Sequence, residues 1–372
     1  MFIKSIVNSF ISSRLKRIDN FVKHPFTVQE ATLFDLIHKA KNTEIGKRYR
    51  FNNIRDVEYF RTWLPLQTYA DIRPYIDRMR KGEQNLLWHG DIRWFAKSAD
   101  DETKLFPVSA EAIEYCHFRG GYDVLGIYAS QNPNTKIFMS KTLTLGGSHQ
   151  INLIENNSFV GDLSAVLIEH FPRWANFVMT PPKNVALLSN LNEKLDIIAK
   201  SSVNKRVVAL TGAASLNLLM LKHILNCTRR KNILEVWHDM ELFVHSGGDF
   251  DAYSAEFEKL IPSPLMNYIE IYNSAAGFFA IQNDPYSDDM LLMLDHGIYY
   301  EFVPVEQIGK EYPEAVTLDD VEINRNYAMV ITTNSGLWRY ITGDTLIFTS
   351  KNPFKIKISE RNKQFINVSN EK

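Results

Sequence analysis

The spacing of hydrophobic residues predicts that the N-terminal part of the chain is mostly helical. Apolar side chains recur at Leu33, Leu36 and Ala40, a spacing typical of one buried helix face. The sequence T-V-Q-E at residues 27–30 has the form of a capping box, so we expect that helix to begin there. The similar T-Y-A-D sequence at residues 68–71 predicts the start of another short helix.

From about Trp94 the pattern becomes mixed, and apolar strand-like runs alternate with helical ones. Helices are expected over 110–127 and 216–228, and strands over 205–210 and 242–245. Strands that alternate with helices predict an α/β sheet, whose ligands usually bind in the loops at the strand ends.

After Asn267 the pattern is rich in β-branched and aromatic residues, with glycine-containing turns between the runs. We expect strands over 290–294, 299–303, 328–333 and 337–341. This part predicts a smaller antiparallel β unit appended to the α/β body.

Composition and charge exclude several classes of protein. The chain has 372 residues, of which 45% are hydrophobic, and this is enough for a sizeable core. Its net charge of −1 gives no general attraction for nucleic acid. The two cysteines, Cys116 and Cys227, form no C-x-x-C pair, so neither a disulfide framework nor a zinc cluster is expected and a reducing cytoplasm fits.

No segment approaches the ~20 apolar residues that are needed to span a bilayer. Residues 1–20 could form an amphipathic helix, which either packs on the domain or lies on a membrane surface.

Candidate chemistry is concentrated in residues 337–344, which read L-W-R-Y-I-T-G-D. They predict a strand that ends in a glycine turn carrying one carboxylate, Asp344. Taken alone, a glycine and an aspartate at a strand end are also ordinary hairpin chemistry.

Together with further segments in the same order, this run resembles the acyl-acid amido synthetases of the Gretchen Hagen 3 (auxin-responsive promoter) family. The resemblance covers nearly the whole chain. The matching segments are 94–109, 145–150, 161–165, 271–279, 288–295, 337–344 and 358–367.

The resemblance implies the fold and the activity of the adenylate-forming superfamily. Such enzymes activate a carboxylic acid with ATP and magnesium, and the amine of an amino acid then attacks the acyl-adenylate. The implied partners are therefore these two small molecules and not nucleic acid. The implied fold is the large N-terminal domain of the adenylate-forming enzymes, α/β with a β-rich subdomain, with the C-terminal cap domain absent.

The same resemblance implies a division of the chain. Residues 1–366 would form the large domain and 367–372 would begin the hinge to the missing cap. Within the large domain, 1–93 would be mainly helical, 94–267 the α/β sheet body and 268–366 the β-rich part.

Several residues match the family's nucleotide site, and the resemblance gives them their roles. Asp344 would accept hydrogen bonds from the ribose hydroxyls, and Arg361 would reach the same ribose. Tyr272 would stack on adenine, although a strand aromatic in the core is an equal alternative. His149, beside Ser148, would lie near the acid pocket, or is a structural histidine. The implied nucleotide-binding residues are Ser98, Thr103, Lys104, Tyr272, Asn273, Tyr340, Asp344 and Arg361.

The segment that matches the phosphate loop departs from the family pattern at its centre. Ala99, Asp100, Asp101 and Glu102 stand where the family has Ser-Gly-Thr-Thr, so the glycine that permits close backbone approach is missing. One carboxylate ~5 Å from a phosphate charge costs about 3 kcal/mol at an effective dielectric near 20. We therefore expect weak phosphate binding and favour a solvated acidic loop.

The magnesium position departs as well, because Ala276 stands where close relatives carry a glutamate. Alanine offers no oxygen to a hard cation, so no metal ligand is predicted. ATP and magnesium are implied by the family, yet both departures predict poor binding. We expect an impaired amido synthetase or, alternatively, a non-catalytic protein that retains nucleoside or acid binding.

Overall fold

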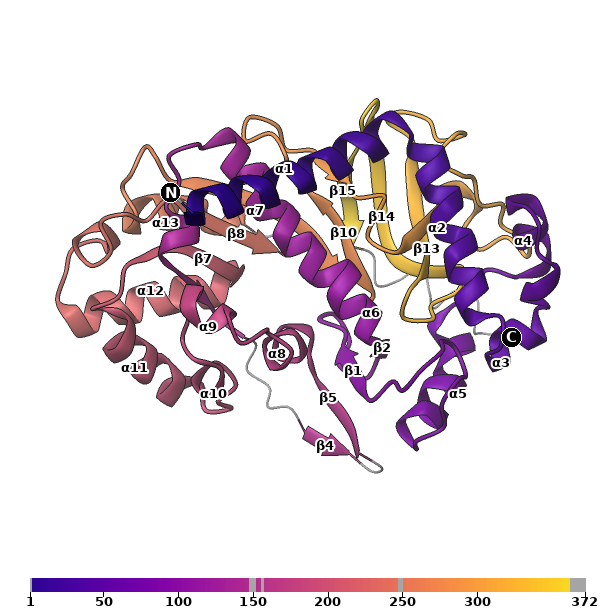
Figure 1. Ribbon diagram of the computed structural model, residues 1–372, viewed down its shortest axis with the longest axis horizontal. Coiled ribbons are helices and arrows are strands. Elements are labelled where there is room, and N and C mark those ends of the chain that lie inside the picture. The colour runs from indigo at the N-terminus through magenta and orange to yellow at the C-terminus, as the bar shows by residue number, and fades with distance from the viewer. Residues whose placement is uncertain (1, 147–151, 155–156, 247–249, 362–372) are drawn as a thin grey trace.

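The computed structural model describes residues 2–146, 152–154, 157–246 and 250–361. Its strands form two sheets (Figure 1). In this part of the chain the smaller sheet has four strands in the order β2-β1-β5-β4, and the larger has eleven in the order β12-β13-β14-β15-β11-β10-β9-β8-β7-β3-β6. The strands are β1 (Trp94–Lys97), β2 (Leu105–Val108), β3 (Lys141–Thr144), β4 (Asn152–Ile154), β5 (Ser158–Asp162), β6 (Met179–Thr180), β7 (Val207–Ala213), β8 (Leu242–Ser246), β9 (Asn267–Ser274), β10 (Gly277–Ile281), β11 (Met290–Leu292), β12 (Ile298–Pro304), β13 (Asn326–Thr333), β14 (Tyr340–Lys351) and β15 (Phe354–Arg361).

Helices pack on these sheets and on one another. In Figure 1, α11, α12 and α13 lie beside β7 and β8, whereas α2 lies beside β13 at the other end of the molecule. The helices are α1 (Phe2–Lys23), α2 (Pro25–Ala40), α3 (Glu44–Arg48), α4 (Val57–Trp63), α5 (Tyr69–Arg80), α6 (Ala110–Ala112), α7 (Arg119–Gln131), α8 (Leu163–Glu169), α9 (Ala175–Val178), α10 (Lys183–Ala186), α11 (Leu191–Ser202), α12 (Ala214–Thr228) and α13 (Asp251–Leu260). A π-helical segment, Ile113–Phe118, joins α6 to α7.

Several local predictions are confirmed. The expected strands at 205–210 and 242–245 are β7 and β8, and the expected helix at 216–228 is α12. The capping box at 68–71 begins α5, because Asp71 accepts hydrogen bonds from the backbone and the hydroxyl of Thr68. Each of these signals lies within the element that it predicts, so the local sequence is sufficient.

The strands of the β-rich part continue the parallel sheet of the α/β body. β6, β3, β7, β8 and β9 pair in parallel, and every pairing from β9 through β10 to β12 is antiparallel. The change of direction therefore occurs at β9. The expected domain boundaries themselves stay a prediction.

Two local predictions are wrong. The helix α2 begins at Pro25, and Thr27 lies within its first turn. Proline is favoured at a first helical position because its missing N–H is not needed there. The strand expected at 337–341 begins only at Tyr340 and runs on to Lys351, so Gly343 and Asp344 lie inside β14 and not at a turn after it.

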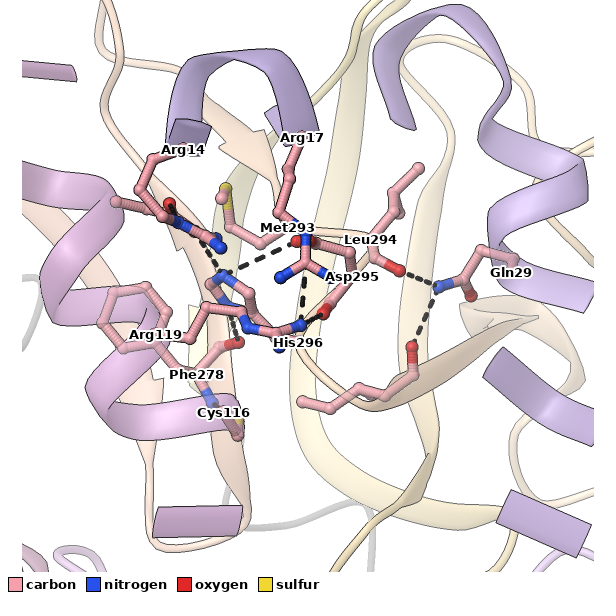
Figure 2. Close-up of polar contacts among 12 residues, drawn as sticks. Arg14, Arg17, Gln29, Cys116, Arg119, Phe278, Met293, Leu294, Asp295 and His296 are labelled. Atoms are coloured by element: carbon pink, nitrogen blue, oxygen red, sulfur yellow. Dashed lines mark hydrogen bonds and ion pairs between the residues drawn. The ribbon is translucent and has the colours of Figure 1, made fainter. Parts of the chain in front are cut away.

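A buried polar cluster fixes α1 on the domain. Arg14 of α1 donates two hydrogen bonds to Asp123 of α7, at 2.6 and 2.7 Å, and His296 Nε2 lies 2.9 Å from the same carboxylate. Figure 2 shows Arg14, Arg119 and His296 converging beside Phe278. The helix expected at 1–20 therefore packs on the domain.

Candidate functional site

The start of β14 is held by contacts from distant parts of the chain. The indole Nε1–H of Trp338 donates to the carbonyl oxygen of Leu87 at 2.9 Å. Arg339 is buried and donates two hydrogen bonds to Glu301, at 2.9 and 2.8 Å. Its backbone adopts the left-handed region with φ of 45°, which is costly for a non-glycine residue. The anchored side chains place Tyr340 at the first position of the strand.

Asp344 follows at an irregularity within β14. Ala328 pairs with Thr345 and Val330 pairs with Ile341, so three residues of β14 lie opposite Met329 alone. Gly343 has a φ of 89°, a conformation that glycine adopts without strain. Such a bulge redirects side chains locally, and it determines where the Asp344 carboxylate points.

That carboxylate accepts a hydrogen bond from Tyr272 of β9. The Tyr272 hydroxyl lies 2.6 Å from Asp344 Oδ2. β15, β11 and β10 lie between these two strands in the sheet. Four strand spacings of ~4.8 Å would separate them by about 19 Å in a flat sheet. The sheet is therefore strongly curled, and the bond closes the curl.

The structure places Tyr272 as a strand aromatic in the core. Only 1% of its surface is exposed, and its ring packs on Phe279 with centroids 4.8 Å apart. Its hydroxyl orients Asp344, a role that neither sequence interpretation contained. Its contact with adenine stays a prediction. A carboxylate has about four acceptor sites, so it can accept from more than one donor.

The loop that matches the phosphate-loop segment connects β1 to β2. The Ser98 N–H donates to the Lys104 carbonyl oxygen at 2.9 Å. Asp101 Oδ1 accepts from the backbone N–H and the hydroxyl of Thr103, at 3.0 and 2.6 Å. The loop is thus closed by its own groups.

Two of the three loop carboxylates are paired with lysines, which the sequence estimate of repulsion ignored. Lys97 Nζ lies 3.1 Å from Glu102, and Lys104 Nζ lies 3.9 Å from Asp101. Three carboxylates against two ammonium groups leave a local charge of −1. Repulsion of a phosphate is therefore weaker than three free carboxylates would cause, but it keeps its sign. Lys104 is already engaged with Asp101.

Tyr69 is a site residue that the sequence analysis missed. Its hydroxyl accepts a hydrogen bond from the N–H of Leu105 at 2.8 Å, where β2 begins. The Tyr69 ring packs against the ring of Phe106. The Phe106 ring in turn packs edge-on against Tyr340, with the two ring centroids 5.6 Å apart. Burial raises the pKa of both Tyr69 and Tyr340, so both stay neutral at physiological pH. The phosphate-loop hairpin is thereby joined to the start of β14. The only local signal was the capping box that positions Tyr69.

The turn between β9 and β10 contains Ala276, which is buried, and its N–H donates to Ser274 Oγ at 3.1 Å. Asn273, which precedes the turn, is half-buried and pairs with Phe278. None of residues 273–277 carries a carboxylate. The turn therefore does not fit a magnesium ion.

Comparison with known families decides the family of this fold. The GH3 family N-terminal domain matches residues 14–266, and the GH3 family central domain matches residues 291–361. The chain belongs to the GH3 family.

Curated GH3 relatives are similar along most of the chain. Indole-3-acetic acid-amido synthetase GH3.8 of Oryza sativa subsp. indica is 37% identical over 401 residues, which cover 90% of this chain and 66% of the relative. Indole-3-acetic acid-amido synthetase GH3.4 of Arabidopsis thaliana is 24% identical over 404 residues, with the same coverage. The chain thus spans about two thirds of the length of these relatives.

Solved structures confirm the expected fold class. The acyl acid amido synthetase AtGH3.15, in complex with 2,4-DB, aligns with a TM-score of 0.80 at 18% identity. The alignment covers 94% of this chain and 70% of the AtGH3.15 chain. An open conformation of 2-hydroxyisobutyryl-CoA ligase has a TM-score of 0.54 at 12% identity, covering 93% and 67%. This GH3 family member therefore has the mixed α/β fold of the adenylate-forming enzymes. In its described part, no helix is both long and apolar enough to cross a bilayer.

The remaining predicted residues of this GH3 site are only partly placed. Ser148 and His149 lie outside the described residues. Arg361 ends β15 with its backbone opposite Asp344, and its side chain lies outside the description. Close to the end of β3, a cavity of about 190 Å³ is bordered by Thr144, Ile168 and Phe171.

Proposed function

We propose that this GH3 family chain binds the nucleoside of an adenylate, and that its ATP-dependent adenylation of a carboxylic acid for ligation to an amino acid is impaired. The observation that supports nucleoside binding is the hydrogen bond from Tyr272 to Asp344. It presents a half-buried carboxylate at a fixed position in the curled sheet, as an acceptor of the ribose hydroxyls would require.

The two ends of ATP fit this chain differently. The nucleoside end meets Asp344, whose fixed oxygens can accept hydroxyl hydrogen bonds. The phosphate end meets a loop that is closed on itself and carries a net charge of −1. Magnesium meets Ala276, which has no ligand atom in its side chain. We therefore assign no catalytic step to a bound magnesium ion in this chain.

A non-catalytic binding protein is the second candidate, and the closed loop and Ala276 favour it. Such a protein would retain nucleoside or carboxylic acid binding without forming an adenylate. Because Cys116 and Cys227 are both free thiols, either candidate is compatible with the reducing cytoplasm that we propose as its location.

ATP–pyrophosphate exchange with a panel of carboxylic acids separates the two candidates. The natural chain is compared with Ala276→Glu, with a loop variant in which residues 99–103 become a Ser-Gly-Thr-Thr-containing loop, and with the double variant. Both changes act on the same ATP–magnesium unit, so their effects should not add independently. We expect measurable exchange only in the double variant.

Other outcomes are equally informative. Exchange by the natural chain at the rate of the double variant would contradict the proposed impairment. If none of the four proteins exchanges but all bind AMP, the non-catalytic candidate is supported. If the natural chain does not bind AMP, both forms of the nucleoside proposal are wrong.

A further inference from the structure

A cluster of metal-ligating side chains lies at the surface where α11 packs on α12. It consists of Asp196 on α11 and of His223 and Cys227 on α12. In Figure 1 these helices lie at the opposite end of the molecule from β14. Asp196 and Cys227 are exposed and His223 is half-buried, so a dissolved ion can reach all three.

Helix geometry brings the three ligand atoms together. His223 and Cys227 are four residues apart, and side chains at this spacing share one face of a helix. His223 Nε2 lies 2.8 Å from Asp196 Oδ1 and 3.6 Å from Cys227 Sγ. All three ligand atoms lie within 4.8 Å of one another. Both contacts involve the same imidazole nitrogen, so the three groups converge on one point.

These distances are close to those of a tetrahedral zinc site. With Zn–S of ~2.3 Å and Zn–N or Zn–O of ~2.0 Å, tetrahedral angles place N and S about 3.5 Å apart and N and O about 3.3 Å apart. The observed distance from Nε2 to Sγ already matches. The distance from Nε2 to Oδ1 must increase by about 0.5 Å, which a small rotation of the exposed Asp196 side chain provides.

We propose that Asp196, His223 and Cys227 bind one Zn²⁺ ion, with water as the fourth ligand. A thiolate, an imidazole and a carboxylate are all ligands that zinc accepts, whereas a thiolate disfavours magnesium and calcium. Binding releases the thiol proton of Cys227 to solvent, because the thiolate is the ligand. The bound ion would connect α11 to α12.

A second triad, formed by Asp123, Asp295 and His296, has similar spacing but opposite surroundings. Arg14 is bonded to Asp123, and Arg17 and Arg119 both lie within 4 Å of Asp295. These guanidinium groups already neutralise the carboxylates of Asp123 and Asp295, so binding of a further cation to this second triad is disfavoured. At the surface triad, Asp196 is instead paired with His223, one of the proposed ligands.

Titration of the full chain with Co²⁺, followed by displacement with Zn²⁺, tests the site. A cobalt ion bound by sulfur has a thiolate-to-metal charge-transfer band, and the sequence has only two cysteines to supply it. We expect one cobalt ion per chain with this band, and its loss on addition of one equivalent of zinc. Cys227→Ser should abolish the band, and the matched variant Cys116→Ser should keep it, since Cys116 is buried.

The other two ligands are tested by Asp196→Asn and His223→Ala. Each should weaken cobalt binding by at least about tenfold, the effect seen even for groups one layer further from a metal. Zinc should also raise the melting temperature of the natural chain but not that of Cys227→Ser, because a ligand stabilises the state that binds it.

A measurement on the natural chain alone guards against variants that fail to fold. Zinc should slow alkylation of the exposed Cys227 by iodoacetamide. Equal alkylation rates with and without saturating zinc would overturn the proposal. So would a charge-transfer band that persists in Cys227→Ser, or the absence of any such band in the natural chain.

Discussion

Replacement of Asp344 is the most direct test of the proposed nucleoside site. A hydrogen bond to a charged group is worth roughly 1.5–3 kcal/mol, so Asp344→Ala should weaken AMP binding by about 10–150-fold. Asp344→Asn keeps an oxygen that can accept from Tyr272 but removes the charge. Neutral hydrogen bonds are worth about 0.5–1.5 kcal/mol, which is less than a bond to a charged group. From this difference, the Asp344→Asn variant should lose about five- to tenfold in AMP affinity.

Tyr272→Phe is the matched control. It removes the 2.6 Å bond to Asp344 and leaves the carboxylate and the buried ring in place. Because only the orientation of the carboxylate changes, we expect a loss of AMP affinity smaller than that of Asp344→Asn.

Isothermal titration calorimetry with AMP gives the three affinities, and urea unfolding shows whether each variant is folded. Asp344→Ala leaves the buried Tyr272 hydroxyl without this acceptor, so it should also lose about 1–3 kcal/mol of unfolding free energy. If the folded variants bind AMP as tightly as the natural chain, Asp344 does not contact the ribose and the reasoning is refuted.

Two further predictions concern the phosphate loop and the buried polar cluster. AMP should bind at least as tightly as ATP–magnesium, because the loop repels further phosphate charge; a preference for ATP–magnesium above about tenfold, ~1.4 kcal/mol, would contradict this. Asp123→Asn should lower the free energy of unfolding by about 3–5 kcal/mol, since it leaves Arg14 buried without its charged partner. Burial alone would raise the Asp123 pKa, but hydrogen bonds from His296 and Arg14 outweigh it and lower the folded-state pKa. The stabilisation by Asp123 is therefore present above about pH 4 and lost as the pH falls further. The free energy of unfolding of Asp123→Asn, measured with urea, should not show this loss at low pH.

Elements with local signals were predictable from the sequence. The buried strand β7, the apolar face of α12 and the Thr68–Asp71 capping box each carry their information within a few residues. Physical chemistry at this range needs no knowledge of the tertiary fold.

The start of β14 was not predictable, because its determinants are distant in sequence. Trp338 bonds to Leu87, and Arg339 bonds to Glu301. These contacts bury residues 337–339 outside the strand, although their composition is typical of one. No period of hydrophobicity encodes such pairing.

In the candidate sites, too, local features were predictable from the sequence, whereas contacts between distant residues were not. Asp344 was found through its Y-x-x-G-D context, but its bond to Tyr272, 72 residues away, was not. The acidic run was visible, whereas its pairing with Lys97 and Lys104 required the hairpin geometry. In the proposed zinc site, the helical spacing of His223 and Cys227 was readable, but Asp196 lies 27 residues from His223. A search for C-x-x-C could not detect that combination.

The curl that brings β9 to β14 has a consequence for the order of folding. The contact between Tyr272 and Asp344 requires that β10, β11 and β15 are already paired between them. Tyr272 and Asp344 are 72 residues apart. Bringing them together costs chain entropy before their contact can contribute any stabilisation. The contact therefore belongs among the last to form during folding and the first to be lost during unfolding. Mild denaturant should abolish AMP binding before most of the secondary structure disappears, so nucleoside affinity would report the completion of folding.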